Sequence, residues 1–375
     1  MIFSRDEFDR RIALTRDAMR ARGADVLILD ESETLTWTVG YASTLSKYRA
    51  CILPLEGEPI YVLRTLDVAP LLERSVVRRH VGVPDAEDPL DAVIAALRAD
   101  GHAEAAIGVD LSGLALTVSR FRRLQAGLPD ARWIDMEGES WRLRLVKSPA
   151  EIALLRRASG IADAAMRRVI AASGPGRTER DAAAIASAAF MELGADPAHV
   201  GPITAGRGWD FLHGHLHDTA LAPGDVLHQE LVPRVNGYSA RLMRPTVIGP
   251  PSEAQREVAA RLVALQDRQY DAMRPGAEAA AVDAILRGPV VSEGLRPTYD
   301  NITGYTLGLY TRDGGRTSDF TRCFLPGSDW RLEAGMAFHM YTSAQGLAFS
   351  DTVLVTQAGG ERLTRIERKL FSTDG

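Results

Sequence analysis

The first 145 residues alternate short apolar runs with helical stretches, and this alternation is the strongest constraint on the fold. An amino-terminal stretch with Phe8, Ile12 and Met19 at helical spacing leads into the apolar run ADVLILD. Residues 48–64 predict a hairpin, because a Gly-Glu-Pro turn separates their two apolar runs. Further helical and strand-like segments alternate after it. The pattern predicts an α/β domain over residues 1–145.

A helix-start signal follows this region. Ser148 is a good N-cap, Pro149 occupies the first helical position, and Glu151 adds negative charge to the first turn. Beyond it, helical segments followed by strand-like segments occur twice, which is a weak internal duplication. The chain, at 375 residues, also exceeds the length that one core usually supports. We therefore expect an α+β protein with two domains, residues 1–145 and 146–375.

Charge and cysteine content restrict the partners of the chain. The net charge of −5 is small and no Lys/Arg run occurs, so neither nucleic acid nor an anionic membrane is expected as a partner. The amino terminus lacks the apolar core of a signal peptide, and no apolar run reaches membrane-spanning length. The only cysteines, Cys51 and Cys323, lie far apart and predict no disulfide framework. We expect a cytoplasmic protein that acts on a small molecule.

Three histidines crowd the stretch FLHGHLHD, and they raise the question of a metal site. On a strand, His213, His215 and His217 would point to one face, as metal ligands often do. Such a site also needs ligands brought from elsewhere, and only scattered candidates such as Asp218 and Glu230 are present. We therefore favour loop histidines with one functional member over a three-histidine metal site.

Longer segments carry a family resemblance. The stretches PGDVLHQELVPRVNGYSARLMRPTVIG, EAGMAFHMYTSAQG and FSDTVLVTQAGG resemble the pita-bread domain of the creatinase, aminopeptidase P and prolidase superfamily. The resemblance covers essentially the whole chain and implies a creatinase-type α/β domain before the pita-bread domain. In the metallopeptidase members two aspartates, one histidine and two glutamates hold two metal ions. The matching positions here hold Glu230, Arg241, Tyr305, Tyr341 and Ser350.

The replacement of four of these five ligands predicts that neither a metal nor another cofactor is bound. A guanidinium is always charged and has no lone pair to donate, so Arg241 should repel a dication. The segments TGYTLGLY, GGRT, GMAFHMYT, SDTVLVT and RKLFSTDG resemble those of ectoine hydrolase, which belongs with creatinase to a metal-free branch. This resemblance implies a hydrolase of a carbon–nitrogen bond (amidine, guanidine or amide) in a small zwitterionic carboxylate.

The resemblance also implies catalytic roles. Creatinase uses a histidine eleven residues before the glycine of its Gly-Asp turn, and that position is His213 here, with Gly224 as the glycine. His213 would act as general base and then general acid, unless it is an ordinary loop histidine. Glu230 would bind a substrate cation or pair with Arg241 or Arg244. Asp351 is a second candidate for the cation, or would orient His213.

The remaining candidates are substrate-binding residues. Arg316 matches a creatinase arginine that binds the substrate carboxylate across the dimer interface, so the resemblance implies a homodimer. Tyr305 and Tyr341 would donate hydroxyl groups where metal ligands stood, or only fill space. Arg241 is a further candidate. Trp37 and Tyr48, in a stretch similar to one that caps the neighbouring subunit's site, would stack on a cation or belong to the core.

Two other functions stay open. The first is a metal-dependent enzyme with an altered ligand set, either an Xaa-Pro dipeptidase or a relative of the dimethylsulfoniopropionate-cleaving lyases. The second is a non-catalytic binding protein that has lost its metals. The lost ligands weigh against the first alternative. The combination of His213, Glu230 and Arg316 weighs against the second, because a binding module needs no acid–base set.

Overall fold

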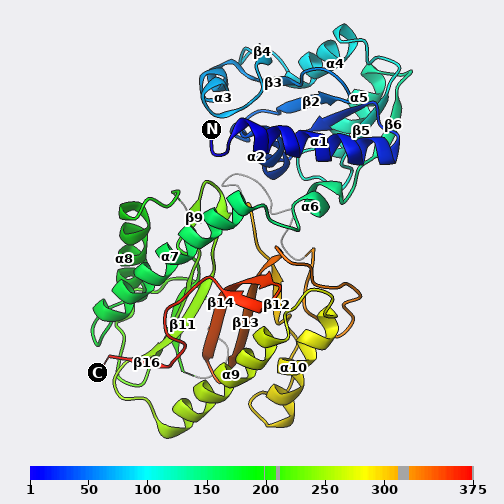
Figure 1. Ribbon diagram of the computed structural model, residues 1–375. Helices are drawn as coiled ribbons and strands as arrows, with labels where there is room; N and C mark the ends of the chain where they lie inside the picture. Colours follow the sequence, from blue (N-terminus) through cyan, green and yellow to red (C-terminus); the bar gives the residue numbers. More distant parts are fainter. Residues whose placement is uncertain (198, 208–211, 311–320, 374–375) are drawn as a thin grey trace. The chain divides into compact units, whose positions relative to one another are not determined.

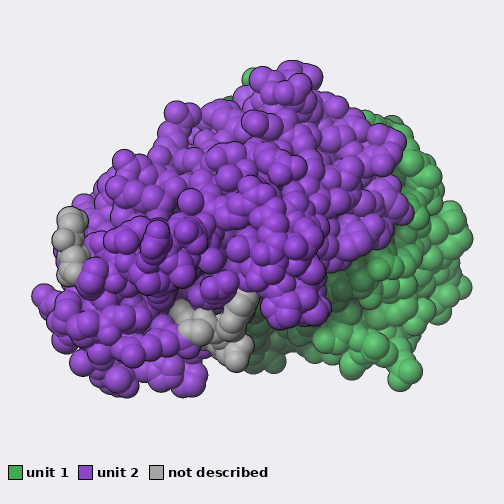
Figure 2. Space-filling view, turned by 90° about the horizontal axis from the view of Figure 1, so that it is seen from below, with its two compact units in different colours: residues 1–144, 309–317 green, residues 145–308, 318–375 purple. Residues whose placement is uncertain are grey.

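The computed structural model describes the chain except for residues 198, 208–211, 311–320 and 374–375 (Figure 1). It divides into two compact units, residues 1–144 with 309–317 and residues 145–308 with 318–375 (Figure 2). Across the described ranges, no helix combines the length and apolar character needed to cross a membrane.

The first unit is an α/β domain, as its alternating pattern predicts. Its elements in chain order are α1 (Arg5–Arg22), β1 (Val26–Leu29), α2 (Ser32–Val39), β2 (Ala50–Pro54), β3 (Ile60–Arg64), η1 (Thr65–Asp67), α3 (Val68–Arg74), β4 (Arg79–Val83), α4 (Pro89–Ala99), β5 (Ala106–Val109), α5 (Val118–Gly127), β6 (Arg132–Asp135) and α6 (Glu139–Leu143).

One six-stranded sheet organises this unit, in the order β4-β3-β2-β1-β5-β6. The predicted hairpin is present, with β2 and β3 antiparallel and Ala50 opposite Val62. Strands β1, β5 and β6 run parallel to one another. Apolar side chains of these strands and of α4 form a buried cluster that includes Val26, Val93 and Ile107. The carboxyl ends of the parallel strands therefore meet at one edge of the sheet.

The second unit repeats helices followed by strands. Helix α7 (Pro149–Ala172) begins at Ser148, whose side chain accepts a hydrogen bond from the Glu151 backbone N–H while the Glu151 side chain caps in return. The other elements are α8 (Glu179–Glu192), β7 (Ile203–Gly206), β8 (Val226–Leu231), β9 (Arg234–Val235), β10 (Tyr238–Ser239), β11 (Leu242–Val247), α9 (Glu253–Asp271), α10 (Ala279–Ser292), β12 (Gly304–Thr306), β13 (Ala337–Ala344), β14 (Leu347–Thr356), β15 (Gly359–Arg362) and β16 (Phe371–Ser372).

The main sheet of this unit has the order β12-β13-β14-β11-β8-β7. This order is symmetric about the β14–β11 pair, because each half presents three strands that follow two helices in the chain. The internal duplication seen in the sequence thus corresponds to two matching halves of one sheet (Figure 1). The α+β class is confirmed.

Helices cover one face of this sheet. Leu227, Leu231 and Leu242 belong to a buried cluster with α7 and α8. Leu347 and Phe349 belong to a second cluster with α9 and α10. Because side chains alternate along a strand, the residues between these apolar positions point to the opposite face. That opposite face carries the polar residues of the candidate active site.

Candidate active site

Strand register places one row of side chains across the second face of the sheet. Glu230 on β8 lies opposite Met243 on β11, and Met243 lies opposite Ser350 on β14. Ser350 in turn lies opposite Tyr341 on β13. Directly opposed residues of antiparallel strands point to the same face, so Glu230, Ser350 and Tyr341 share it. Sequence positions 120 residues apart are thereby brought into one line.

A second row runs beside the first. Tyr305 on β12 lies opposite His339, and His339 lies opposite Thr352. Arg241 continues the row, because its backbone N–H donates to Thr352 Oγ1 at 2.8 Å and its carbonyl accepts from the same hydroxyl at 3.0 Å. The two rows together hold all five positions at which the superfamily resemblance places metal ligands.

Arg241 connects the two rows. Its Nη1 donates to Glu230 Oε1 at 3.4 Å and also to the Tyr305 hydroxyl. The guanidinium carbon lies 5.2 Å from the centroid of the Tyr305 ring. Glu230 and Arg241 are both buried, at 3% and 8% exposure. A buried charge pair of this kind is strongly coupled, so loss of one partner leaves the other uncompensated.

The residues present do not fit a dinuclear metal centre. Divalent metals need lone pairs, yet Arg241 offers only donors and a positive charge at the centre of the rows. Tyr305, Tyr341 and Ser350 contribute neutral hydroxyl groups, and burial raises the pKa of Tyr341, which keeps it protonated. Within the described ranges, no group of three or more His, Cys, Asp or Glu side chains is arranged to hold a metal ion.

Two buried histidines on this face were not singled out in the sequence. His339 is fully buried, stacks on Tyr341 with ring centroids 5.3 Å apart, and meets the edge of Tyr305 at 5.1 Å. His228 lies two residues before Glu230 on β8, so both point the same way. Neither ring nitrogen of either histidine has a hydrogen-bond partner within the described part of the chain. The sequence contains a signal for both histidines. The segments HQE (228–230) and HMY (339–341) each place a histidine two residues before a position where the resemblance puts a metal ligand.

Burial keeps both histidines neutral. Desolvation lowers the pKa of His228 to about 3, with a further contribution from the nearby charge of His213. Desolvation also lowers the pKa of His339, and the positive charge of Arg241 adds to this effect.

The three loop histidines do not form one cluster of equivalent groups. His213 is exposed and lies after the undescribed residues 208–211. His217 is anchored, because its backbone N–H donates to Glu179 Oε2 at 2.6 Å and its Nδ1 lies 3.1 Å from the same oxygen. His215 is exposed and its ring centroid lies 4.6 Å from that of His217.

The segment that runs beside Glu230 requires a glycine at position 201. Gly201 has a φ of 114°, and a Cβ there would lie 1.9 Å from the Glu230 carbonyl oxygen. The adjacent Pro202 carbonyl accepts a hydrogen bond from the Glu230 backbone N–H at 2.8 Å. This close approach fixes the backbone of β8 at the carboxylate.

Asp351 lies on the other face of the sheet. It follows Ser350, so its side chain points toward the helices, where it is fully buried. Its Oδ1 accepts from Arg244 Nη2 and from Thr364 Oγ1, both at 2.8 Å. Its Oδ2 accepts from the Tyr270 hydroxyl at 3.4 Å. The structure therefore does not bring Asp351 together with Glu230, although the two positions are close in the sheet.

The remaining candidate residues lie in the first unit or outside the residues that the structure describes. Trp37 is buried there beneath the Arg11 guanidinium, 5.0 Å from its ring centroid. Tyr48 is buried too, and its hydroxyl donates to Asp30 Oδ2 at 2.9 Å. Both rings thus have internal partners in the first unit. Arg316 lies outside the described residues.

Comparisons with known proteins agree with this architecture. The family model described as metallopeptidase family M24 matches residues 153–357, and that of the creatinase/prolidase N-terminal domain matches residues 11–146. Ectoine hydrolase of Halomonas elongata is 26% identical over 396 residues, which cover 98% of each chain. The probable dipeptidase PepE of Mycobacterium tuberculosis is 29% identical over 380 residues, covering 98% of this chain and 97% of that protein.

A solved structure shows the same fold. Dipeptidase PepE from Mycobacterium ulcerans superposes with a TM-score of 0.81 at 28% identity, and the match covers 99% of both chains. The resemblance read from the sequence segments is thus confirmed at the level of the superfamily, for both domains. The chain belongs to metallopeptidase family M24 and carries a creatinase/prolidase N-terminal domain.

Proposed function

We propose that the chain hydrolyses a carbon–nitrogen bond in a small zwitterionic carboxylate without a dinuclear metal centre. One observation carries the proposal. The guanidinium of Arg241 lies among the family's ligand positions, bonded to Glu230 and to the Tyr305 hydroxyl. In this proposal a fixed positive charge stands where the resemblance places the metal ligands of the metallopeptidase members.

Arg241 supplies electrostatic stabilisation in this proposal. A guanidinium stays protonated at any physiological pH and presents several N–H donors in a rigid plane. Its pairing with Glu230 and Tyr305 holds that plane in place before substrate arrives. A preorganised donor of this kind stabilises negative charge that develops on an oxygen or nitrogen in the transition state.

Glu230 has two tasks. It orients Arg241 through Oε1, and a carboxylate has further lone pairs that accept hydrogen bonds from a cationic substrate group. The sequence offered these as alternatives, namely a substrate-binding group or an arginine partner. The ion pair with Arg241 supports the role of arginine partner. Glu230 Oε2 can still accept a hydrogen bond from the substrate.

His213 moves the proton. As the water oxygen adds to the reacting carbon, His213 takes the proton that water loses. When the carbon–nitrogen bond breaks, the same proton passes to the leaving nitrogen. An imidazole can accept a proton and later donate it, so one histidine can carry out both steps. Burial lowers the pKa of His228 to about 3, which makes it too weak a base for this step.

The relatives leave two substrate classes open. One similar protein is named ectoine hydrolase and another is named a probable dipeptidase. The first name supports a small cyclic amidine or related zwitterion as substrate, and the second supports a dipeptide. The chemistry of Arg241 favours the first class, because the dipeptidases of this family are metallopeptidases by description.

A substrate panel tests the proposal. The purified protein is assayed by mass spectrometry with ectoine, creatine, cyclic amidines and Xaa-Pro dipeptides, with and without chelator, after elemental analysis. We expect turnover of a zwitterion from the first group that chelator does not reduce. Arg241→Ala should lower this turnover by about 10²- to 10³-fold, the range for loss of a transition-state donor.

Arg274→Ala, on an arginine of the second unit that lies outside the two rows, is the matched control and should keep wild-type turnover. Dipeptide cleavage that requires added metal would instead establish a metal-dependent dipeptidase with altered ligands. A saturable thermal shift with a panel compound, without turnover of any compound, would establish a binding protein.

A further inference from the structure

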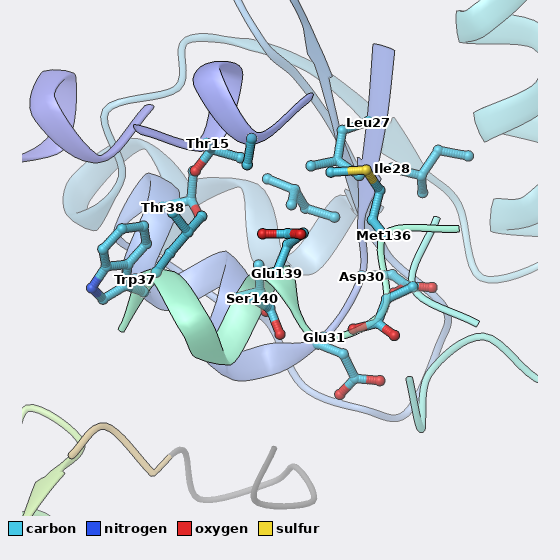
Figure 3. Close-up of a pocket in the computed structure, with 15 residues that line it drawn as sticks. Thr15, Leu27, Ile28, Asp30, Glu31, Trp37, Thr38, Met136, Glu139 and Ser140 are labelled. Atoms are coloured by element: carbon cyan, nitrogen blue, oxygen red, sulfur yellow. The ribbon is translucent and has the colours of Figure 1, made fainter. Parts of the chain in front are cut away.

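A pocket in the first unit has no role in the proposed reaction. It lies between α1, β1, α2 and α6, and Figure 3 shows Asp30, Glu31 and Thr38 among the side chains that surround it. The cavity measures about 30 Å³. By the same measure about 10–15 Å³ holds one water molecule, so the cavity takes a group of one or two heavy atoms.

The sheet topology collects acids beside this pocket. Strands β1, β5 and β6 are parallel neighbours, and each is followed or ended by an aspartate, namely Asp30, Asp110 and Asp135. The carboxyl ends of parallel strands are the edge at which α/β sheets bind ligands. Asp30 and Asp110 line the pocket together with Glu31, the N-cap residue of α2.

Within the described part of the chain these three lining carboxylates form no ion pair, although the charge of Arg49 lowers the pKa values of Asp30 and Glu31. Asp30 accepts from the Tyr48 hydroxyl at 2.9 Å, and Glu31 accepts from the Ala115 backbone N–H at 2.5 Å. Asp110 accepts from the Ser112 backbone N–H and hydroxyl. Among the described residues, all of these donors are neutral. A fourth lining carboxylate, Glu139, pairs with Arg22 and Arg142.

Buried hydroxyl groups provide an independent sign of a ligand. Thr34 and Thr38 are one helical turn apart on α2 and line the same pocket. They are 8% and 0% exposed, and the Oγ1 of each has no hydrogen-bond partner within the described part of the chain. Buried polar atoms are normally paired, so two unpaired hydroxyl groups in the wall of the pocket are a sign that a hydrogen-bonding ligand occupies it.

The residues that line the pocket indicate which chemical group it can bind. An ammonium group has three N–H donors and no acceptor, which suits hydroxyl and carboxylate oxygens. The oxygens are not gathered into a metal-holding group anywhere in the described chain. Leu27, Met136 and Leu143 form an apolar wall, which suits a short alkyl body. We propose that this pocket binds a small primary alkylammonium ion, with methylammonium as the simplest case.

Protonation of the pocket should oppose binding. Burial raises the pKa of Asp30 to about 7, a hydrogen bond from Tyr48 lowers it, Glu31 and Asp110 raise it, and Arg49 lowers it. Burial also raises the pKa values of Glu31 and Asp110. The charged form of Asp30 therefore grows as pH rises through about 7, while an alkylamine remains protonated up to about pH 10. Affinity should increase from pH 6 to pH 8.

Calorimetric titration of the full chain with methylammonium chloride, at constant ionic strength, tests the proposal. We expect saturable binding at pH 8 that weakens at least tenfold in Asp30→Asn and severalfold in Thr38→Val. Tetramethylammonium, which has no N–H donor, and potassium should not compete. Glu73→Gln, on an exposed carboxylate outside the pocket, is the matched control and should bind as wild type does.

Several results would overturn the proposal. These are no saturable binding by the folded wild type, equal binding of potassium or tetramethylammonium, or unchanged affinity in Asp30→Asn. If Asp30→Asn does not fold, unchanged affinity in Thr38→Val overturns it instead. The site lies in the first unit and the proposed chemistry in the second, so failure of either proposal leaves the other standing.

Discussion

Replacement of Asp351 by asparagine separates a structural from a catalytic role. Asp351 and Arg244 are both fully buried and joined at 2.8 Å on the helix-covered face of the sheet. Asparagine keeps the shape of the side chain and removes its charge. Arg244 would then remain buried without the carboxylate that neutralises it.

The expected loss of unfolding free energy depends on the hydrogen bonds that Arg244 retains in Asp351→Asn. Removal of one partner of a buried ion pair typically costs about 3–5 kcal/mol. Arg244 still donates to four backbone carbonyls, those of Met243, Ser350, Ile366 and Glu367, at 2.7 to 3.1 Å. These bonds solvate the guanidinium in part, so we expect the lower end, about 3 kcal/mol of unfolding free energy. A loss of about 3 kcal/mol makes amide hydrogen exchange about a hundredfold faster at those amides that exchange only when the whole protein unfolds.

Hydrogen-exchange mass spectrometry of peptides from β11 and β14 measures this effect, and melting temperature gives a second readout. The matched control is Glu192→Gln, which breaks the exposed Arg168–Glu192 pair at 2.5 Å. Exposed pairs contribute little, so exchange in this variant should barely change. If Asp351→Asn exchanged like wild type yet lost turnover, Asp351 would take part in the chemistry and our structural assignment would be wrong.

Four further predictions concern other parts of the chain. His213→Ala should lower turnover by about 10²- to 10⁴-fold with an unchanged melting temperature, whereas loss in His215→Ala instead would show that the wrong histidine was chosen. Gly201→Ala should lower the melting temperature, because its Cβ would meet the Glu230 carbonyl; an unchanged value contradicts the close approach. Because burial raises the pKa of Asp30 from 3.8 to about 7, its contribution to stability is full below about pH 4 and is lost as pH rises through 7. Asp30→Asn should remove that fall in urea titrations, and a retained fall would assign it to another group. Finally, Arg316→Lys should raise the apparent substrate constant of a homodimer, since lysine lacks the bidentate contact; an active monomer in sedimentation analysis would refute this.

Local patterns were sufficient for much of the architecture. The Ser148 cap and the Gly-Glu-Pro hairpin turn depend on neighbouring residues only, and both are present as expected. The repeat of helices and strands also required no long-range information. The positions at which the resemblance places metal ligands came from matching segments, and the strand register brings these positions into two adjoining rows.

Other features depended on which face each side chain takes. Asp351 looked like a site residue because it adjoins Ser350, but one step along a strand reverses the side chain, and it pairs with Arg244 beneath the helices. Trp37 and Tyr48 were candidates by resemblance, and their rings have partners inside the first unit.

The sequence by itself determined the α+β class, the family and the residue types at the positions where the resemblance places metal ligands, because these depend on local propensity and on residue type. Only the tertiary structure decided that Arg241 pairs with Glu230 and Tyr305, and that His228 and His339 lie beside them. It also decided that Asp30 and Asp110 share a pocket. The physical reason is that charge pairing and burial depend on contacts between residues that lie far apart in the sequence. Strand register and the packing of helices on one face create these contacts, and no local pattern encodes them.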